Sequence, residues 1–208
     1  MSNGLDFSYL PEKDAKACKA FEEFMRRDPW QAFNSVKRML TPEVCIELVN
    51  EKGFYVSLDD IPDVCRTEEV CFEAVKKHGY MLQYVPWKAR TEKVCLAAVE
   101  NDGTALEYIG GSLSDNFKIS LAAVRQNGLA LEFSNARYNS SHSRELCLEA
   151  VRQNGLALRY VPEKERDLEM CKAAVKTDIT DDEVLDFIPD DIRKGAETVR
   201  QFLDMYPD

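Results

Sequence analysis

The chain contains little glycine or proline, and it has no long apolar stretch that is free of charge. Of its 208 residues, 9 are glycine and 8 are proline, which excludes collagen-like and disordered classes. No stretch approaches the roughly 18 apolar residues of a membrane-spanning helix. The first residues, MSNGLD, lack the basic and apolar regions of a secretory signal. We therefore expect a cytoplasmic protein, while secretion as an effector without a classical signal stays open.

Positive charge is also scarce. The chain has 27 lysines and arginines against 37 aspartates and glutamates, a formal net charge of −10. Proteins that neutralise phosphates carry the opposite balance, and anionic lipid surfaces repel an acidic chain. We therefore expect neither a nucleic acid nor a membrane as partner.

The usual signatures of catalysis are missing. The sequence has no G-x-G-x-x-G, no P-loop, no H-E-x-x-H and no G-x-S-x-G motif. The two histidines, His78 and His142, lie far apart, and the closest cysteines, Cys65 and Cys71, are too widely spaced for a zinc pair. We expect no enzyme, no metal and no cofactor. Cys65 is the best candidate for an accessible thiol, because it lies outside the periodic pattern described next.

The other six cysteines recur about every 25 residues. They are Cys18, Cys45, Cys71, Cys95, Cys147 and Cys171, and Ser120 stands in the one long gap. The chain reads FEAVKKHGYMLQYVP from Phe72, LAAVENDGTALEYIG from Leu96, LAAVRQNGLALEFSN from Leu121 and LEAVRQNGLALRYVP from Leu148. Self-similarity at a fixed period of this length is typical of helical repeat proteins. The recurring cysteines are then small core residues, which explains how serine can replace one of them.

Each unit reads as two helices. A capping residue stands just before the cysteine: Thr41, Thr67, Thr91, Ser143 or Asp167. The apolar spacing that follows predicts an amphipathic helix A, which ends at Asn-Gly, Asp-Gly or His-Gly with the glycine in the left-handed conformation. A shorter helix B, such as 156–161, follows and stops before a proline.

One such unit is too small to fold alone. Burying four or five side chains contributes roughly 8–12 kcal/mol, whereas ordering each of about 25 backbone residues costs about 1–2 kcal/mol. We therefore predict an all-α fold, an α-solenoid of about six to seven stacked helix-turn-helix repeats with terminal capping helices. It forms a single domain over 1–208, with an N-terminal cap at 1–40, repeats at 41–189 and a C-terminal capping helix at 190–208.

The unit C-L-x-A-V-x-x-N-G-x-A-L-x-Y-V-P resembles a mainly bacterial repeat family described as domain of unknown function four-one-one-six. The resemblance is strong from Cys71 to Pro162 and fair from Cys45 to Pro189. It implies a helical repeat protein. It brings no activity and no catalytic residue.

Two aromatic residues are candidate contacts for a partner. Trp87 follows a proline at a site where the other units carry Glu12, Asp63, Glu163 or Asp190, and tryptophan is enriched in binding hot spots. Tyr138 lies in the polar segment 134–143, which lengthens one connection between units. Packing beneath a neighbouring loop is the alternative for Trp87, and an inert solvated insertion is the alternative for the segment around Tyr138.

Charges supply the remaining candidates. All the charged residues between Lys176 and Arg193 are acidic. We take five of them as candidate contacts for a basic protein partner: Asp181, Asp182, Asp186, Asp190 and Asp191. A merely solubilising end is the alternative. A row of cations shares one position at the end of helix A, where it complements the helix dipole: Lys76, Arg125, Arg152 and Lys176.

The function predicted from these features is protein recognition by a rigid helical-repeat surface without catalysis. The alternative is an acidic decoy or inhibitor that mimics DNA, or acts as a secreted effector, and occupies a basic surface of its partner. An enzyme of unfamiliar type is the second alternative, and it would need a deep pocket with converging acids.

Overall fold

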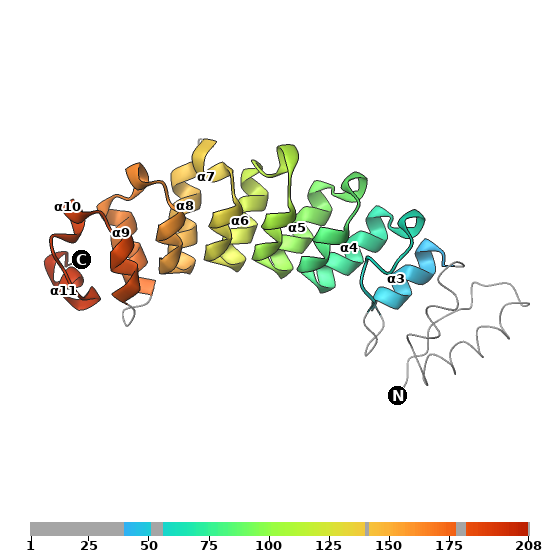
Figure 1. Cartoon of the computed structure of the whole chain (residues 1–208), viewed down its shortest axis with the longest axis horizontal. Helices are drawn as coiled ribbons and strands as arrows, with labels where there is room; N and C mark the ends of the chain where they lie inside the picture. The colour runs from blue at the N-terminus through green and yellow to red at the C-terminus, as the bar shows by residue number, and fades with distance from the viewer. Residues whose placement is uncertain (1–39, 51–55, 140–141, 178–181, 208) are drawn as a thin grey trace, which may run out of the picture.

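The computed structural model describes residues 40–50, 56–139, 142–177 and 182–207, with the side chains of Tyr138 and Asn139 left out. These residues form α-helices and 3₁₀-helices, and no strand occurs among them. The helices lie side by side in chain order in one extended row (Figure 1). The expected N-terminal cap, with Cys18 and the expected core residue Trp30, lies outside the described residues apart from Leu40.

The row alternates α-helices with six-residue 3₁₀-helices. The α-helices are α3 (Pro42–Asn50), α4 (Glu68–Lys77), α5 (Glu92–Asn101), α6 (Phe117–Gln126), α8 (Ser143–Gln153) and α9 (Leu168–Thr177). The 3₁₀-helices are η3 (Gly79–Tyr84), η5 (Gly103–Tyr108), η7 (Gly128–Phe133), η8 (Gly155–Tyr160) and η10 (Asp182–Phe187). The predicted helix B is thus a 3₁₀-helix, a form that suits segments too short to gain from α-helical hydrogen bonds.

A third, very short element follows each of these five 3₁₀-helices, and η2 (Asp63–Cys65) is the equivalent element after α3. The other five are η4 (Trp87–Ala89), η6 (Gly111–Leu113), α7 (Ala136–Asn139), η9 (Glu163–Glu165) and α10 (Asp190–Arg193). The last α-helix is α11 (Val199–Met205). The expected single C-terminal helix is therefore divided in two, because Lys194 and Gly195 have φ angles of 50° and 79° and end α10.

The recurring cysteines lie in the core between units. Cys45, Cys71, Cys95, Cys147 and Cys171 are each 0% exposed, which agrees with the role predicted from their period. The prediction for Cys65 was wrong. Its side chain is 2% exposed and its thiol donates a hydrogen bond to the Leu40 carbonyl at 3.1 Å, so it packs against the preceding unit.

Ser120 replaces the cysteine without exposing its hydroxyl. It is 0% exposed, and the Ser134 hydroxyl donates to it at 2.8 Å. Ser134 stands where other units carry Val85, Ile109 or Val161. A buried hydroxyl without a partner costs free energy, so the two serines act as a pair.

We expect Ser134→Ala to lower the free energy of unfolding by about 1–3 kcal/mol, because the Ser120 hydroxyl loses this partner inside the core. The double variant Ser120→Cys with Ser134→Val recreates the pair of the other units and should regain most of that loss. Urea unfolding followed by circular dichroism measures both. A double variant no more stable than Ser134→Ala would contradict the coupling.

Most of the predicted helix caps are present. The side chains of Thr67, Thr91 and Asp167 accept hydrogen bonds from the backbone amides three residues later. Ser143 does not cap α8; it is the first residue of the helix, and its hydroxyl donates to the Arg137 carbonyl. The cap of α6 is Asn116, which the sequence pattern had not singled out.

The glycines after the α-helices have a different role from the predicted one. Among the described glycines only Gly111 and Gly195 have positive φ, so Gly79, Gly103, Gly128 and Gly155 are not left-handed caps. A Cβ atom on any of these four would lie 2.3–2.5 Å from a carbonyl oxygen of the next α-helix. Glycine is needed here because two units approach closely, and not because the turn is strained.

Side-chain amides form hydrogen bonds across the same close contact between units. The Gly103 amide donates to Gln126 Oε1 at 2.7 Å, and Gln126 Nε2 donates to the Asn101 carbonyl at 3.2 Å. One side chain of the following unit therefore satisfies both a donor and an acceptor at the end of the preceding helix. Asn101 and Gln153 make the equivalent contacts.

Arginines tie the units together at the far end of the 3₁₀-helices. Arg90 donates from Nε to the Val85 carbonyl at 2.9 Å, from Nη2 to Gln83 at 3.3 Å, and from Nη1 to Tyr108 of the next unit at 2.6 Å. The guanidinium thus satisfies three carbonyls that end two successive 3₁₀-helices. Arg66 and Arg166 repeat all three contacts.

Candidate functional site

The short elements after each 3₁₀-helix form one margin of the row, which we call the turn edge. It comprises residues 62–66, 86–90, 110–114, 134–139, 162–166 and 189–193. Labels α7 and α10 in Figure 1 mark it, and the other short turns follow the same margin. Trp87, Asp190, Asp191 and the backbone of Tyr138 share this edge, whereas Asp182 and Asp186 belong to η10.

Trp87 projects from the turn edge. It begins η4 and is 79% exposed, so the alternative of packing beneath a neighbouring loop does not hold. The turn beneath it is well ordered by hydrogen bonds. The Ala89 amide donates to the Pro86 carbonyl at 2.8 Å, the Arg90 amide donates to Trp87 at 3.2 Å, and Ala89 itself is buried. A large apolar side chain is therefore held in water by a rigid turn.

Val64 lies on the preceding turn of the same edge and was missed by the sequence reasoning. Its side chain is 86% exposed, the highest value among the large exposed hydrophobic residues described. It stands where the units at 88 and 164 carry lysine. Aligning the units would have revealed Val64, since it occupies a position that is charged in other units, just as Trp87 does at the position of Glu163.

The acidic candidates are split between structural and exposed positions. Asp182 Oδ1 accepts from the Val199 amide at 2.7 Å, so it binds the first amide of α11, whose N-cap is Thr198. Asp186 lies 3.7 Å from Arg193 in an exposed ion pair. Asp190 and Asp191 are exposed on the turn edge. The structure therefore does not bring the described acids together in one charged cluster, because η10 and α10 present them on different parts of the unit.

Two candidates cannot be placed as side chains. Asp181 lies outside the described residues. Tyr138 belongs to α7 on the turn edge, and its side chain is outside the described part. In this connection α7 occurs in the place of the three-residue turns.

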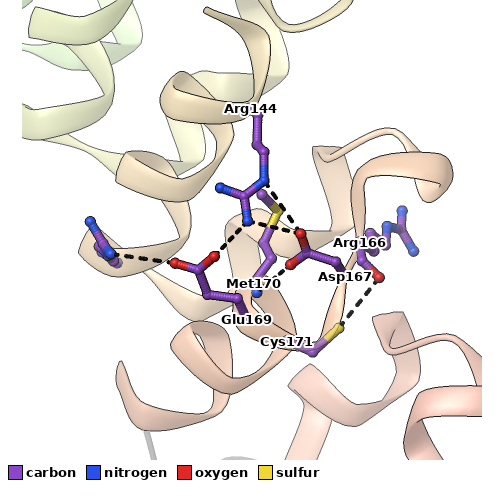
Figure 2. Close-up of polar contacts among 7 residues, drawn as sticks. Arg144, Arg166, Asp167, Glu169, Met170 and Cys171 are labelled. Carbon is purple, nitrogen blue, oxygen red and sulfur yellow. Dashed lines mark hydrogen bonds and ion pairs between the residues drawn. The ribbon is translucent and has the colours of Figure 1, made fainter.

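A charged cluster lies at the start of α9, directly after the turn-edge segment 162–166. Arg144 of α8 is within 2.8 Å of Asp167 and 2.6 Å of Glu169, and Figure 2 shows its guanidinium between the two carboxylates. Partial burial alone would raise the pKa of Asp167, but the hydrogen bonds from Arg144 and the Met170 amide outweigh it and lower that pKa. These pairs are exposed and contribute little to stability.

The predicted row of cations falls on the α-helices. Lys76, Arg125 and Arg152 lie 3.7–4.0 Å from glutamates of the same or the next α-helix, namely Glu73, Glu149 and Glu169. Two shallow grooves run beside three members of the row. One, of about 670 Å³, includes Arg152 and Lys176 in its lining, and one of about 510 Å³ includes Lys76.

The five described cysteines that recur with the period of the units are poor nucleophiles. Burial raises the pKa of Cys71, Cys95 and Cys147 to about 11 and contributes most to raising those of Cys45 and Cys171 to about 12. Such thiols stay protonated near neutral pH. Burial, aided by Lys77, also lowers the pKa of His78. Within the described ranges, no three histidine, cysteine or acidic residues come together as metal ligands would.

The comparisons with known proteins bear on the family alone. Within the described part of the chain no helix has the length and apolar character needed to cross a bilayer. Neither the curated proteins nor the solved structures contain a match to the chain. A family model described as Domain of unknown function (DUF4116) matches residues 91–137 and 143–193, as two adjacent copies. Residues 91–193 are therefore consistent with two adjacent copies of the DUF4116 unit, from a family of unknown function.

Proposed function

We propose that the chain is an α-solenoid of about six to seven stacked units whose rigid surface recognises another protein without catalysis. The contacts between successive units support the stacking, since Gly103, Gln126 and Arg90 each join one unit to the next. Nearest-neighbour packing of this kind gives a stiff scaffold on which surface residues keep fixed positions.

The observation that carries the proposal is the pair of exposed apolar side chains on the turn edge. Val64 is 86% exposed and Trp87 is 79% exposed, on successive turns, at positions where other units carry charge. Exposing a tryptophan to water costs free energy that burial against a partner would recover. Rigid aromatic anchors are also the residues that dominate binding energies. We place the centre of the contact at Trp87, with Val64 beside it and Tyr138 further along the edge.

Acidic residues take a secondary part in this proposal. Asp190 and Asp191 lie on the turn edge and favour a partner with basic residues at that end. The decoy alternative is less well supported, because Asp182 accepts a hydrogen bond from the Val199 amide and Asp186 already pairs with Arg193. Those two charges are engaged within the chain and contribute less to an external field.

The test is affinity capture from a lysate of the source cells, followed by quantitative mass spectrometry. The variant Val64→Ser with Trp87→Ala should recover at least about tenfold less of the proteins that wild type retains, since hot-spot residues contribute 2 kcal/mol or more. Glu163→Ala with Lys164→Ser is the matched control, because these residues occupy the same two positions on a later turn and are also exposed.

The control variant should capture the same proteins as wild type. Equal recovery by all three proteins would rule out the exposed pair as the contact. Circular dichroism of each variant confirms that the fold is unchanged, which is expected because neither substitution touches the core.

A further inference from the structure

The groove between α8 and α9 differs in chemistry from its counterpart between α4 and α5. Repeat alignment places Arg152, Lys172, Ala173, Lys176 and Thr177 of the first groove at the positions of Lys76, Leu96, Ala97, Glu100 and Asn101 in the second. The two grooves therefore share one place in the fold. Their charges differ, because lysine replaces leucine at 172 and glutamate at 176.

The α8–α9 groove is cationic in an acidic chain. Arg152, Lys172 and Lys176 line it together with one carboxylate, Glu169. That carboxylate also contacts Arg144, at 2.6 Å, outside the groove. The Lys172 ammonium lies close to the C-terminal end of the chain, where it donates to the Pro207 carbonyl at 3.1 Å. Cations therefore outnumber carboxylates by three to one in the lining of this groove, in a molecule whose formal net charge is −10.

The same groove also offers an apolar surface. Leu168 is 39% exposed and stands where α4 and α5 begin with glutamate. Ala173 lines the groove between the lysines and leaves room for a side chain from outside. In the α4–α5 groove the corresponding space is partly covered, because the Lys93 ammonium lies 4.2 Å from the centre of the Phe72 ring.

We propose that the groove between α8 and α9 binds an acidic protein segment in which carboxylates flank an aliphatic side chain. The three cations complement the carboxylates, and Leu168 and Ala173 complement the aliphatic residue. Charge pairing of this kind supplies specificity and fast association, while the apolar contact adds affinity. The site is distinct from the turn edge, so it goes beyond the recognition surface centred on Trp87.

Selection from a displayed library of random dodecapeptides against the full chain tests the proposal without a known partner. The variant Lys172→Leu with Lys176→Glu serves for counter-selection. It gives the groove the two residues that the α4–α5 groove already carries, so the fold tolerates both. The peptides enriched on wild type should contain aspartate or glutamate on both sides of leucine, isoleucine or valine.

A labelled peptide from the selection should bind wild type at least about tenfold more tightly than the variant, and more weakly as NaCl rises from about 50 to about 300 mM. Arg152→Gln is a second variant, and it should also weaken binding. Val64→Ser with Trp87→Ala should bind the peptide as wild type does, so the two proposals can fail separately.

Three results would overturn the proposal. Enriched peptides without acidic residues would show that charge does not select the ligand. Equal affinity of wild type and the lysine variant would place the peptide elsewhere. Sedimentation that shows self-association of wild type but not of the variant would assign the groove to a second copy of the chain.

Discussion

Replacing Gly128 by alanine should lower the free energy of unfolding by about 3 kcal/mol, a large effect for one added methyl group. The new Cβ would lie 2.4 Å from the Ala150 carbonyl oxygen and 2.9 Å from Gln153 Oε1. The carbonyl belongs to the backbone of α8 and cannot rotate away. The two units must separate, which also weakens the hydrogen bond from the Gly128 amide to Gln153.

Gly110 is the matched control for this experiment. A Cβ atom there would meet no atom within 4 Å, and the φ of −117° is open to any residue. Gly110→Ala should leave stability unchanged or raise it by about 0.4–1 kcal/mol, because it restricts the unfolded chain. Urea unfolding followed by circular dichroism measures both variants. Equal effects at the two glycines would show that close approach of the units is not what requires Gly128.

The second large effect is a loss of stability in alkaline solution. Burial raises the pKa of five thiols from 9.0 to about 11 or 12. In the unfolded chain these thiols ionise from about pH 9, while in the folded chain they remain neutral. A raised pKa in the folded state means that the stabilisation is complete below pH 9 and is lost as the pH rises through the folded values.

The expected size follows from linkage. Ionisation of each thiol in the unfolded chain lowers the free energy of unfolding by about 1 kcal/mol per pH unit above about 9. Five thiols therefore lower it by on the order of 5 kcal/mol at about pH 10. Urea unfolding midpoints under reducing conditions at about pH 8 and about pH 10 test this. Cys95→Ala with Cys147→Ala should unfold more easily at both pH values and lose less stability between them. A pH dependence identical to that of wild type would exclude the thiols as the cause.

Much of the helical arrangement could be predicted from spacing. The recurrence of cysteine every 25 residues or so placed α4, α5, α8 and α9, because a residue that fills one core position in each unit must recur at the length of the unit. The caps Thr67 and Thr91 followed from the local chemistry of helix starts. The nature of the second helix did not follow, because six residues carry too little periodicity to separate α from 3₁₀.

The contacts between units could not be predicted from the sequence, for a different reason. The sequence Asn-Gly is equally compatible with a left-handed helix cap and with a close approach of two units. Only the position of the Ala150 carbonyl shows that Gly128 serves the close approach. Arg90 recurs visibly at 66 and 166, yet its partners lie up to 18 residues away along the chain. Sequence places a residue in its own unit and does not show which carbonyl of the next unit it meets.

Some residues of the candidate site could be found by comparing the units, and others could not. Trp87 was singled out because it replaces a charged residue at a wet position, and its exposure agrees with that argument. Val64 could have been found by the same comparison. The contact of Asp182 with the first amide of α11 could not be recognised, because its partner Val199 lies 17 residues later and is brought near only by the packing of α11.

By itself the sequence determined the helical class, the repeating unit, the buried row of cysteines and the resemblance to the DUF4116 family, because all of these depend on periodic burial or on motifs within one unit. Tertiary structure alone decided that the glycines serve close approach, that the arginines join successive units and that Cys65 is buried. The physical reason is distance along the chain. Periodicity records which face of a helix is buried, whereas the identity of the atoms on the other side depends on how neighbouring units stack.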